Sequence, residues 1–336
     1  MAEPTISILM PVYNAAPFLE DCIDSILSQD FRDWELIAVN DQSLDDSALI
    51  LERYAKQDAR IKSLNNTSEK GIIPALRLAF ENSSGRFITR MDADDRMPTS
   101  KLNLLYSLLE KEGPGYVSTG KVEYFSDTVL KDGYKRYASW LNGLVDQNCH
   151  ALEVFRECVI PSPAWLIGRS DLCRCEAFDS DRYPEDYDLV FRFFKHGLQV
   201  ACTDEVVHYW RDHADRTSRN DETYSQNAYF DIKVHYLPFF VADSNKQLIL
   251  WGAGRKGKRL AKKLIDAGLS FLWTCNVESK WGHIIQGQEM KEPSSLSALE
   301  NPMVLIAVSG PQDQLDLERQ LKAQGLEKGI SYYFFC

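Results

Sequence analysis

Three carboxylates are crowded into four positions of this chain, directly after an apolar run. Phe87 to Met91 has the character of a buried strand, and Asp92, Asp94 and Asp95 follow it. In an extended chain Asp92 and Asp94 point in the same direction, one repeat apart. Carboxylates packed this closely repel one another, and a hard divalent cation relieves the repulsion. The stretch predicts a metal-binding loop at a strand end; the alternative is an acidic turn solvated by water.

Apolar runs alternate with helical patterns through about the first hundred residues. The runs at 5–10, 34–39, 61–64 and 87–91 are predicted strands, and helical spacing follows each of the first three. The first run is expected to end at Pro11, because proline cannot donate to a strand ladder. Strand and helix in alternation favour an α/β fold with a doubly wound, mostly parallel sheet.

The polar loops that follow these strands are expected to share one edge of the sheet. In a sheet of this kind the ligand lies beyond the carboxyl ends of the strands. The loops at 11–14, 40–45 and 92–95 all fall there and are rich in polar groups. Their convergence predicts a binding site. The aromatic stretch 125–148 fits no clear pattern and is a candidate cover for it.

The composition is that of a soluble globular protein long enough for two domains. The 336 residues are 44% hydrophobic and 26% charged. A net charge of −11 argues against nucleic acid as a partner, and an acidic domain that handles an anionic substrate needs a metal in between. The eight cysteines include no CxxC pair, so we expect free thiols in a reducing compartment.

The sequence gives no sign of a membrane span or a signal peptide. No apolar run approaches the length of a span, and the first four residues lack the basic and apolar regions of a leader. We therefore expect a cytoplasmic protein. Peripheral contact with the inner face of the membrane stays open.

A second α/β pattern occupies the end of the chain. An apolar run at 248–251 leads into the glycine turn of Gly252, Gly254 and Gly257, and a helical pattern follows. A GxGxxG turn between a strand and a helix is typical of nucleotide-binding domains. We expect a smaller Rossmann-like domain over 246–336, joined to the first domain by a helical linker at 221–245.

The ligand of this second domain is only weakly indicated. Cys275-Asn276 stands where a dinucleotide site has an acid for the ribose, so NAD-dependent catalysis is disfavoured. A structural, homodimerising or regulatory role is favoured instead. The helix after the glycine turn is basic, suited to a phosphate or an anionic partner, or simply a solvated face. The basic residues are Arg255, Lys256, Lys258, Arg259, Lys262 and Lys263.

The first 220 or so residues resemble family 2 glycosyltransferases of the GT-A fold. Five motifs occur in the family's order and spacing: Ile8-Leu9-Met10-Pro11-Val12-Tyr13-Asn14, Val39-Asn40-Asp41-Gln42-Ser43-Leu44-Asp45, Asp92-Ala93-Asp94-Asp95, Glu185-Asp186 and Tyr209-Trp210-Arg211-Asp212-His213. Two positions depart from the family's pattern. Asn40 and Gln42 stand where aspartate and glycine are commoner, so recognition of the base could rest on Asp41.

The resemblance implies a fold and a reaction for residues 1–220. The fold would be GT-A, and the reaction an inverting, metal-dependent transfer from a nucleotide-diphosphate sugar. A UDP-sugar is favoured as donor. The acceptor would be a hydroxyl of a polysaccharide, an oligosaccharide or a lipid-linked glycan of the cell envelope.

The resemblance also implies the metal ligands. Asp94 is the first ligand, Asp92 reaches the ribose or the metal, and Asp95 assists. His213 is a further ligand or a hydrogen-bond donor to the diphosphate, with a surface histidine as the alternative. Oxygen ligands suit Mg²⁺ or Mn²⁺, and a histidine ligand favours Mn²⁺.

A base must accept the proton of the attacking hydroxyl, and the Glu185-Asp186 pair supplies the candidates. Asp186 is preferred and Glu185 is the alternate, because the amide groups at a helix start can hold a carboxylate. The competing interpretation is a helix cap without chemistry.

The remaining candidates line the donor and acceptor sites. The expected donor-site residues are Pro11, Tyr13, Asn14, Asn40, Asp41, Asp45, Arg90, Asp92, Ala93 and Asp94. Tyr13 could instead pack at the sheet edge, and Arg90 could be a solvated arginine. For the acceptor we expect an aromatic platform or, equally, core packing by Tyr134, Tyr137, Trp140 and Trp165.

Two hypotheses compete with catalysis of sugar transfer. One is a nucleotide-sugar sensor or scaffold with the transferase fold and no turnover, which the retained Asp94, Asp186 and His213 disfavour. The other is an NAD-dependent oxidoreductase built on the second domain, which the missing ribose acid disfavours.

Overall fold

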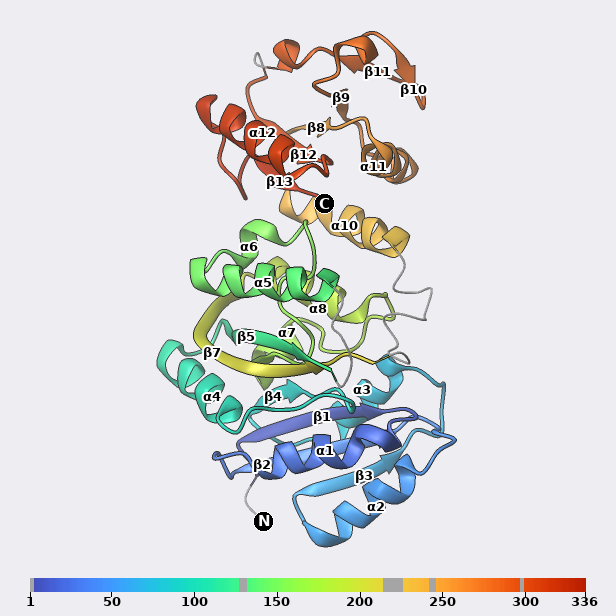
Figure 1. Cartoon of the computed structure of the whole chain (residues 1–336), viewed down its shortest axis with the longest axis vertical. Coiled ribbons are helices and arrows are strands. Elements are labelled where there is room, and N and C mark those ends of the chain that lie inside the picture. Colours follow the sequence, from blue (N-terminus) through green and yellow to red (C-terminus); the bar gives the residue numbers. More distant parts are fainter. Residues whose placement is uncertain (1–2, 127–131, 214–225, 242–245, 297–298) are drawn as a thin grey trace. The chain divides into compact units, whose positions relative to one another are not determined.

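The chain folds into two compact α/β units, each built on its own sheet (Figure 1). The computed structural model describes residues 3–126, 132–213, 226–241, 246–296 and 299–336. The first unit comprises Met1–His150 and Ile160–Asn220, and the second Ala151–Val159 and Asp221–Cys336. Residues 151–159 thus pack with the end of the chain, an arrangement that no pattern in the sequence indicates.

The first sheet has seven strands in the order β3-β2-β1-β4-β6-β5-β7. Its pairs are parallel except where β6 runs against both of its neighbours. The sheet is therefore doubly wound and mostly parallel, as predicted. Its strands are β1 (Ile6–Val12), β2 (Trp34–Asn40), β3 (Ile61–Asn65), β4 (Phe87–Arg90), β5 (Tyr116–Phe125), β6 (Trp165–Gly168) and β7 (Gln199–Arg211).

Amphipathic helices connect and cover these strands. In α1, for example, Leu19, Cys22, Ile23 and Ile26 are buried at helical spacing, and each large apolar side chain contributes about 1.5–3 kcal/mol when fully buried. Among the other helices, α3 packs on β1 and β2, and α5 on β5. The helices are α1 (Ala16–Leu27), α2 (Ser47–Gln57), α3 (Ile72–Glu81), α4 (Lys101–Glu112), α5 (Asp132–Gln147), α6 (His150–Glu153), α7 (Arg169–Arg174) and α8 (Glu185–Lys195).

The expected end of the first strand at Pro11 is wrong, because β1 continues to Val12. The Val12 carbonyl accepts a hydrogen bond from the Asp41 N–H, so Val12 faces β2. Backbone groups alternate along a strand, so Pro11 faces the β4 side. Pairing with β4 has already ended at Leu9. The missing N–H of proline therefore interrupts no ladder bond.

Strand β7 pairs with β5 irregularly around Gly120 to Val122, because a bulge interrupts the alternation of side chains there. The unassigned stretch 125–148 contains α5, whereas residues 127–131 lie outside the described part of the chain.

The second sheet has six strands in the order β10-β11-β9-β8-β12-β13, parallel apart from the β10–β11 hairpin. The predicted second α/β domain is therefore present, and most of the predicted linker is helix α10. The elements are α10 (Gln226–Phe240), β8 (Gln247–Trp251), α11 (Arg255–Asp266), β9 (Leu272–Thr274), β10 (Ile284–Ile285), β11 (Gln288–Lys291), β12 (Pro302–Ile306), α12 (Pro311–Ala323) and β13 (Tyr332–Phe334), with 3₁₀ turns at Glu278–Lys280 and Pro293–Leu296.

Segment 151–159 joins the second unit through aromatic packing. The Phe155 ring is fully buried and stacks on Phe335, with ring centroids 4.9 Å apart. Tyr333 and Phe240 meet the same ring edge to face. Aromatic pairs of this kind add about 0.5–1.5 kcal/mol beyond their buried area.

No helix in the described part of the chain combines the length and the apolar character that crossing a membrane requires. All eight cysteines are described, and all are free thiols.

Candidate active site

The first two predicted loops meet at the carboxyl edge of the first sheet. The Asn14 side-chain oxygen accepts a hydrogen bond from the Leu44 N–H at 2.8 Å, and the Asn14 N–H donates to the Ser43 hydroxyl at 3.0 Å. Asp45 accepts from the N–H groups of Ala16 and Ser47. Burial alone would raise the pKa of Asp45, but these hydrogen bonds outweigh it and hold the pKa below its ordinary value.

Asp41 and Asn40 are buried, and their side chains form hydrogen bonds with residues at and after the end of β3. The two Asp41 carboxylate oxygens accept hydrogen bonds from the Asn66 side-chain amide at 2.6 Å and the Gly71 N–H at 2.9 Å. The Asn40 amide donates to Asn65 at 3.0 Å. Both side chains are therefore fixed in position before any ligand arrives.

Gln42 shows why glycine is commoner at its position. Its φ is 59°, in the left-handed region that side chains with a Cβ rarely adopt. A non-glycine residue there carries strain of about 1–2 kcal/mol. The Gln42 side-chain amide donates to the Ser68 carbonyl at 2.9 Å, which offsets part of this strain.

Tyr13 presents its ring at this edge. The side chain is 46% exposed, so the alternative of packing at the sheet edge does not account for it. The Lys70 ammonium lies 3.6 Å from the centre of the ring, within the range of a cation–π contact. Pro11 is half-buried beside it in β1.

Arg90 brings the two acidic motifs together. Its guanidinium is buried and donates from Nε to Asp92 at 2.8 Å and from Nη1 to Glu185 at 3.0 Å. The alternative of a solvated arginine is therefore wrong. Arg90 and Glu185 are 95 positions apart in the chain, and their contact brings the loop at 92–95 beside the start of α8.

Asp95 faces the sheet and is fully buried. Its carboxylate accepts from the Arg211 N–H at 2.8 Å and lies 2.9 Å from His208 Nε2. Both partners belong to β7, so Asp95 ties the acidic loop to that strand. The sequence did not identify His208, which reads as one more residue of a strand. Ala93, also named for the donor site, is buried.

Asp94 and His213 lie next to each other at the open side of the loop. Asp94 Oδ2 and His213 Nε2 are 2.9 Å apart, and both side chains are partly exposed. The imidazole packs on Phe18, with ring centroids 4.5 Å apart. His213 Nδ1 is buried without a hydrogen-bond partner among the described residues.

Asp94 and His213 together provide two ligand atoms of the kind that divalent cations bind. A carboxylate oxygen and an imidazole nitrogen 2.9 Å apart are both ligands that Mn²⁺ accepts. Among the described residues there is no cluster of three or more His, Cys, Asp or Glu side chains that could hold a metal ion. The donor set therefore fits a cation that completes its shell with oxygens of the substrate and water.

Asp186 and Glu185 occupy the first turn of α8 but have different surroundings. Pro184 is the N-cap residue, so neither acid is the cap that the competing interpretation required. Glu185 is buried against Arg90. Asp186 is partly exposed and accepts a hydrogen bond from the Tyr187 N–H at 2.7 Å. Burial, reinforced by the neighbouring charge of Glu185, raises the pKa of Asp186 to about 7.

The proposed aromatic platform divides into two parts. Trp165 is buried in β6 and meets Phe193 edge to face, so it belongs to the core. Tyr137 stacks on both Trp140 and Trp210, with centroids 5.8 and 6.1 Å away. Tyr134 contacts the neighbouring Tyr124. Tyr134, Tyr137 and Trp140 are partly exposed, whereas Trp210 is buried beneath them. A sugar ring could stack on the three exposed rings.

Lys101 is a buried charge that the sequence did not mark. It lies at the start of α4, where a lysine normally reads as solvated, and its ammonium donates to the Pro163 carbonyl. Burial lowers the pKa of Lys101 to about 7, while the negative charges of Asp92 and Asp95 act in the opposite direction. The positive charge of Lys101 therefore balances part of the negative charge of the acidic loop from the buried side.

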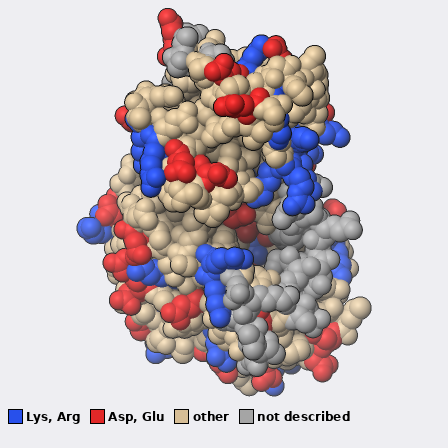
Figure 2. All heavy atoms as spheres, turned by 45° about the horizontal axis from the view of Figure 1, so that its top comes forward, with Lys and Arg blue, Asp and Glu red and all other residues tan. Residues whose placement is uncertain are grey.

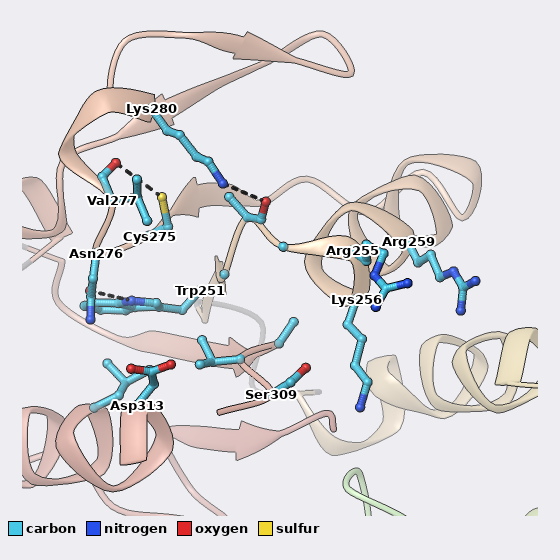
Figure 3. A pocket seen from close by; sticks show the side chains of 16 residues that line it. Trp251, Arg255, Lys256, Arg259, Cys275, Asn276, Val277, Lys280, Ser309 and Asp313 are labelled. Carbon is cyan, nitrogen blue, oxygen red and sulfur yellow. Dashed lines mark hydrogen bonds between the residues drawn. The ribbon is translucent and has the colours of Figure 1, made fainter. Parts of the chain in front are cut away.

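The glycines of the second unit lie at the turn between β8 and α11. Gly252, Gly254 and Gly257 come together there, and the first two line a cavity (Figure 3). The cavity lies at the carboxyl edge of the second sheet.

Comparison with known proteins identifies the first unit. The model of glycosyl transferase family 2 matches residues 7–172. EpsE of Bacillus subtilis (strain 168), a protein named as a glycosyltransferase, is 28% identical over 226 residues, which is 66% of this chain and 78% of EpsE. The UDP-Glc:alpha-D-GlcNAc-diphosphoundecaprenol beta-1,3-glucosyltransferase WfgD of Escherichia coli is 34% identical over 117 residues, 35% of this chain and 46% of WfgD.

A solved structure shares the fold. Residues 1–349 of S. aureus TarS in complex with UDP-GlcNAc superpose with a TM-score of 0.54 at 14% identity, covering 77% of this chain and 71% of that one. The family match, the relatives and the carboxyl-edge loops agree. Residues 7–172 therefore form a domain of glycosyl transferase family 2.

Proposed function

We propose that the first unit catalyses an inverting, metal-dependent sugar transfer with Asp186 as the general base. The donor is a nucleotide-diphosphate sugar, with a UDP-sugar favoured, and the acceptor is a hydroxyl of a cell-envelope polysaccharide, oligosaccharide or glycolipid. One observation supports the proposal above the others: Arg90 joins Asp92 to Glu185, the residue that precedes Asp186.

The donor assignment rests on the loops of β1 and β2. Asn14, Asp41 and Asp45 are fixed by protein hydrogen bonds, and Tyr13 offers an exposed ring on which a base can stack. The names of WfgD and of the TarS complex both specify a uridine diphosphate sugar. These similarities favour UDP over other carriers for this chain.

Asp94 and His213 are the residues that would hold Mn²⁺ or Mg²⁺, with Asp92 directed by Arg90 toward the ribose or the metal. When bound, the cation would supply positive charge for the diphosphate that leaves as the glycosidic bond breaks. The unit's acidic loop otherwise repels that diphosphate. Arg90 and Lys101 balance part of the loop from its buried side.

Asp186 would accept the proton of the acceptor hydroxyl. The hydroxyl oxygen attacks the anomeric carbon as the bond to the diphosphate breaks, and the proton passes to the Asp186 carboxylate. A pKa near 7 suits this work, because a base is most effective when its pKa lies near the working pH. Glu185 is the weaker candidate, since Arg90 holds its carboxylate as a buried ion pair.

The acceptor and its cellular location are inferred from the name of a relative and from a group of partly exposed aromatic side chains. WfgD acts, by its name, on a diphosphoundecaprenol-linked sugar. Tyr134, Tyr137 and Trp140 provide stacked rings for a glycan. We therefore favour a lipid-linked acceptor at the inner face of the membrane. In this proposal residues 1–220 carry the chemistry, and 246–336 a regulatory or homodimerising role.

The experiment that tests this function is an assay of nucleoside-diphosphate release from UDP-, GDP- and dTDP-sugars, with Mn²⁺ or with EDTA. We expect turnover with UDP-sugars and Mn²⁺, and none in EDTA. Thermal stabilisation by a nucleotide sugar without turnover on any tested glycan or lipid-linked acceptor would favour the non-catalytic sensor. Equal turnover in EDTA would contradict the metal requirement.

A further inference from the structure

A cavity of about 730 Å³ lies within the second unit. Its walls are the loops after β8, β9 and β12 and the first turn of α11 (Figure 3). Ligands of open α/β sheets bind beyond the carboxyl ends of the strands, and small-molecule sites measure about 300–1,000 Å³. The cavity therefore has the position and the size of a ligand site, and the family match at residues 7–172 does not extend to it.

Two of the three glycines are required by the fold itself. Gly252 has a φ of 131°, and a Cβ there would lie 2.7 Å from the Ala307 carbonyl oxygen. A Cβ on Gly257 would lie 2.0 Å from the Gly252 carbonyl oxygen. These residues let the helix approach the strand end, so they carry no information about a ligand.

Gly254 is different, because nothing in the described structure requires it. Its φ is −80°, which any residue adopts, and a Cβ built on it meets no described atom within 4 Å. Serine or aspartate at this N-cap position would stabilise the helix more than glycine does. A glycine at this point of the cavity wall is explained if a ligand must approach the backbone closely, because a side chain would block that approach.

Basic side chains surround the same part of the wall. Arg255, Lys256 and Arg259 project from the start of α11, and Lys280 comes from the opposite rim, where its ammonium donates to the Ala253 carbonyl (Figure 3). Asp313 is the single acid among the lining residues. Figure 2 shows basic side chains gathered on the side where Figure 1 draws α11, although the chain as a whole carries a charge of −11.

Helices α11 and α12 both begin at this edge. They differ in whether an acidic side chain compensates the partial positive charge of the helix amino terminus. Asp313 lies in the first turn of α12, close enough that a Cβ on Gly310 would touch its carboxylate. The first turn of α11, described in full, has no acid and no side-chain cap. Cations at a helix amino terminus are unfavourable by about 0.3–1 kcal/mol each. Arg255 and Lys256 occupy that position, so a bound anion would compensate them.

The rest of the wall suits the uncharged part of a nucleotide. Trp251, Val277 and Leu317 contribute apolar surface, and the Asn276 side-chain oxygen accepts from the Trp251 indole at 3.0 Å. Asn276 stands where a dinucleotide site has a carboxylate for the ribose. The site therefore favours a phosphate group over the paired ribose contacts of NAD.

We propose that this cavity is a second ligand site, for a phosphate-bearing small molecule of nucleotide size whose phosphate lies against Gly254 between Arg255 and Arg259. The site needs no metal, because backbone amides and guanidinium groups supply the positive charge. The site would bind its ligand whether or not the first unit catalyses the transfer that we propose for it.

The test is calorimetric titration of the full-length protein, in EDTA, with ADP, UDP and inorganic pyrophosphate. The expected result is saturable binding of at least one probe, with pyrophosphate showing whether the phosphate alone is sufficient. The double variant Arg255→Glu/Arg259→Glu should weaken binding at least 10-fold. Gly254→Val should do the same, because it fills the approach to the backbone without a clash in the described structure.

The matched control is Lys258→Glu/Lys262→Glu, which reverses two charges on exposed positions of the same helix outside the cavity wall. It should change the affinity less than 2-fold. Circular dichroism and thermal melting check that each variant is folded. Equal affinity in cavity and control variants would overturn the proposal, and so would the absence of binding of all three probes to the wild-type protein.

Discussion

The carboxyl edges of the two sheets have the same place in the topology and opposite charge. In the first unit the edge carries Asp92, Asp94 and Asp186, and Arg90 and Lys101 balance these acids from buried positions. In the second unit the charged residues that line the cavity are basic apart from Asp313, and Arg255 and Arg259 are exposed. The topology therefore predicts a ligand at the carboxyl edge of each sheet. The charges of the loops decide whether a phosphate binds the protein directly or through a cation.

This difference leads to two ways of binding a diphosphate. An acidic edge needs a cation between the protein and the phosphates, and such a cation can also assist bond cleavage. A basic edge with free helix amides holds a phosphate directly and supplies no such assistance. We therefore expect the chemistry in the first unit, and binding without chemistry in the second.

The largest expected effect comes from Asp94→Ala in the acidic edge. Loss of this carboxylate removes the hydrogen-bond partner of His213 and the side chain that we propose as the first metal ligand. We predict a fall in transfer rate of about 1,000-fold, equivalent to roughly 4 kcal/mol of transition-state stabilisation. The measurement is the initial rate over a Mn²⁺ titration.

Asp313→Ala, which removes the acid from the opposite edge, is the control and should leave the transfer rate within about 2-fold. If both variants lost activity to the same extent, the two edges would not differ as we describe.

Arg90→Met should be the most destabilising change tested at either edge. It leaves Glu185 buried without its guanidinium partner and weakens the hold on Asp92. Breaking a buried pair on one side raises the free energy of the folded state by about 3–5 kcal/mol. Urea unfolding at pH 7.5 measures this loss, and Arg90→Met/Glu185→Gln should recover part of it.

The exposed counterpart, Arg255→Met, should change the free energy of unfolding by less than about 0.5 kcal/mol, the usual range for surface positions. A similar loss in both arginine variants would show that Arg90 is not a special contact between the acidic motifs.

The pH dependence of stability should carry the signature of Asp186. Its folded-state pKa of about 7 lies above the ordinary value, so its contribution to stability is fully present below pH 4 and is lost as pH rises through 7. Asp186→Asn removes that loss. We predict that the variant is more stable than wild type by about 1 kcal/mol at pH 8 and not at pH 4. Thermal melting at the two pH values is the measurement.

If Asp186 were an unburied acid in the first turn of the helix, Asp186→Asn would lower the stability at pH 8 and not raise it. Its replacement by asparagine removes a favourable interaction with the helix dipole, worth about 0.3–1 kcal/mol, and lowers stability at pH 8. That outcome would contradict the raised pKa.

The smallest effect is expected for Gln42→Gly in the donor loop. Glycine relieves the strain at φ 59° but loses the hydrogen bond to Ser68 and is freer in the unfolded chain. These terms oppose one another, so the free energy of unfolding should change by less than about 1 kcal/mol. Denaturant unfolding and a donor titration check this, and a large loss of donor affinity would show that the Gln42 side chain takes part in binding.

The sequence contained enough to predict both sheets and the meeting of the first two polar loops at one edge. Apolar runs located β1 to β4, and the acids that follow Met91 marked a strand end. Helical spacing also placed Asp186 at a helix start. These features depend on neighbours along the chain, which is why pattern and propensity report them.

The contacts across the site could not be predicted, because they join residues far apart in the chain. Arg90 meets Glu185 across 95 positions, and Asp95 meets His208 across 113. The packing of Phe155 with Phe335 is a third case. Trp165 read as a possible sugar platform, since an aromatic side chain looks the same in a core strand and at a binding surface.

The central claim is that Asp186 is the base, and the measurement that tests it most directly is the transfer rate of Asp186→Asn at saturating donor. Asparagine keeps the size of the side chain but cannot accept a proton. With donor affinity unchanged, the account predicts a rate lower by about 100- to 10,000-fold, the usual contribution of a positioned base. Near-normal transfer by a variant that binds the donor as tightly as wild type would contradict the assignment.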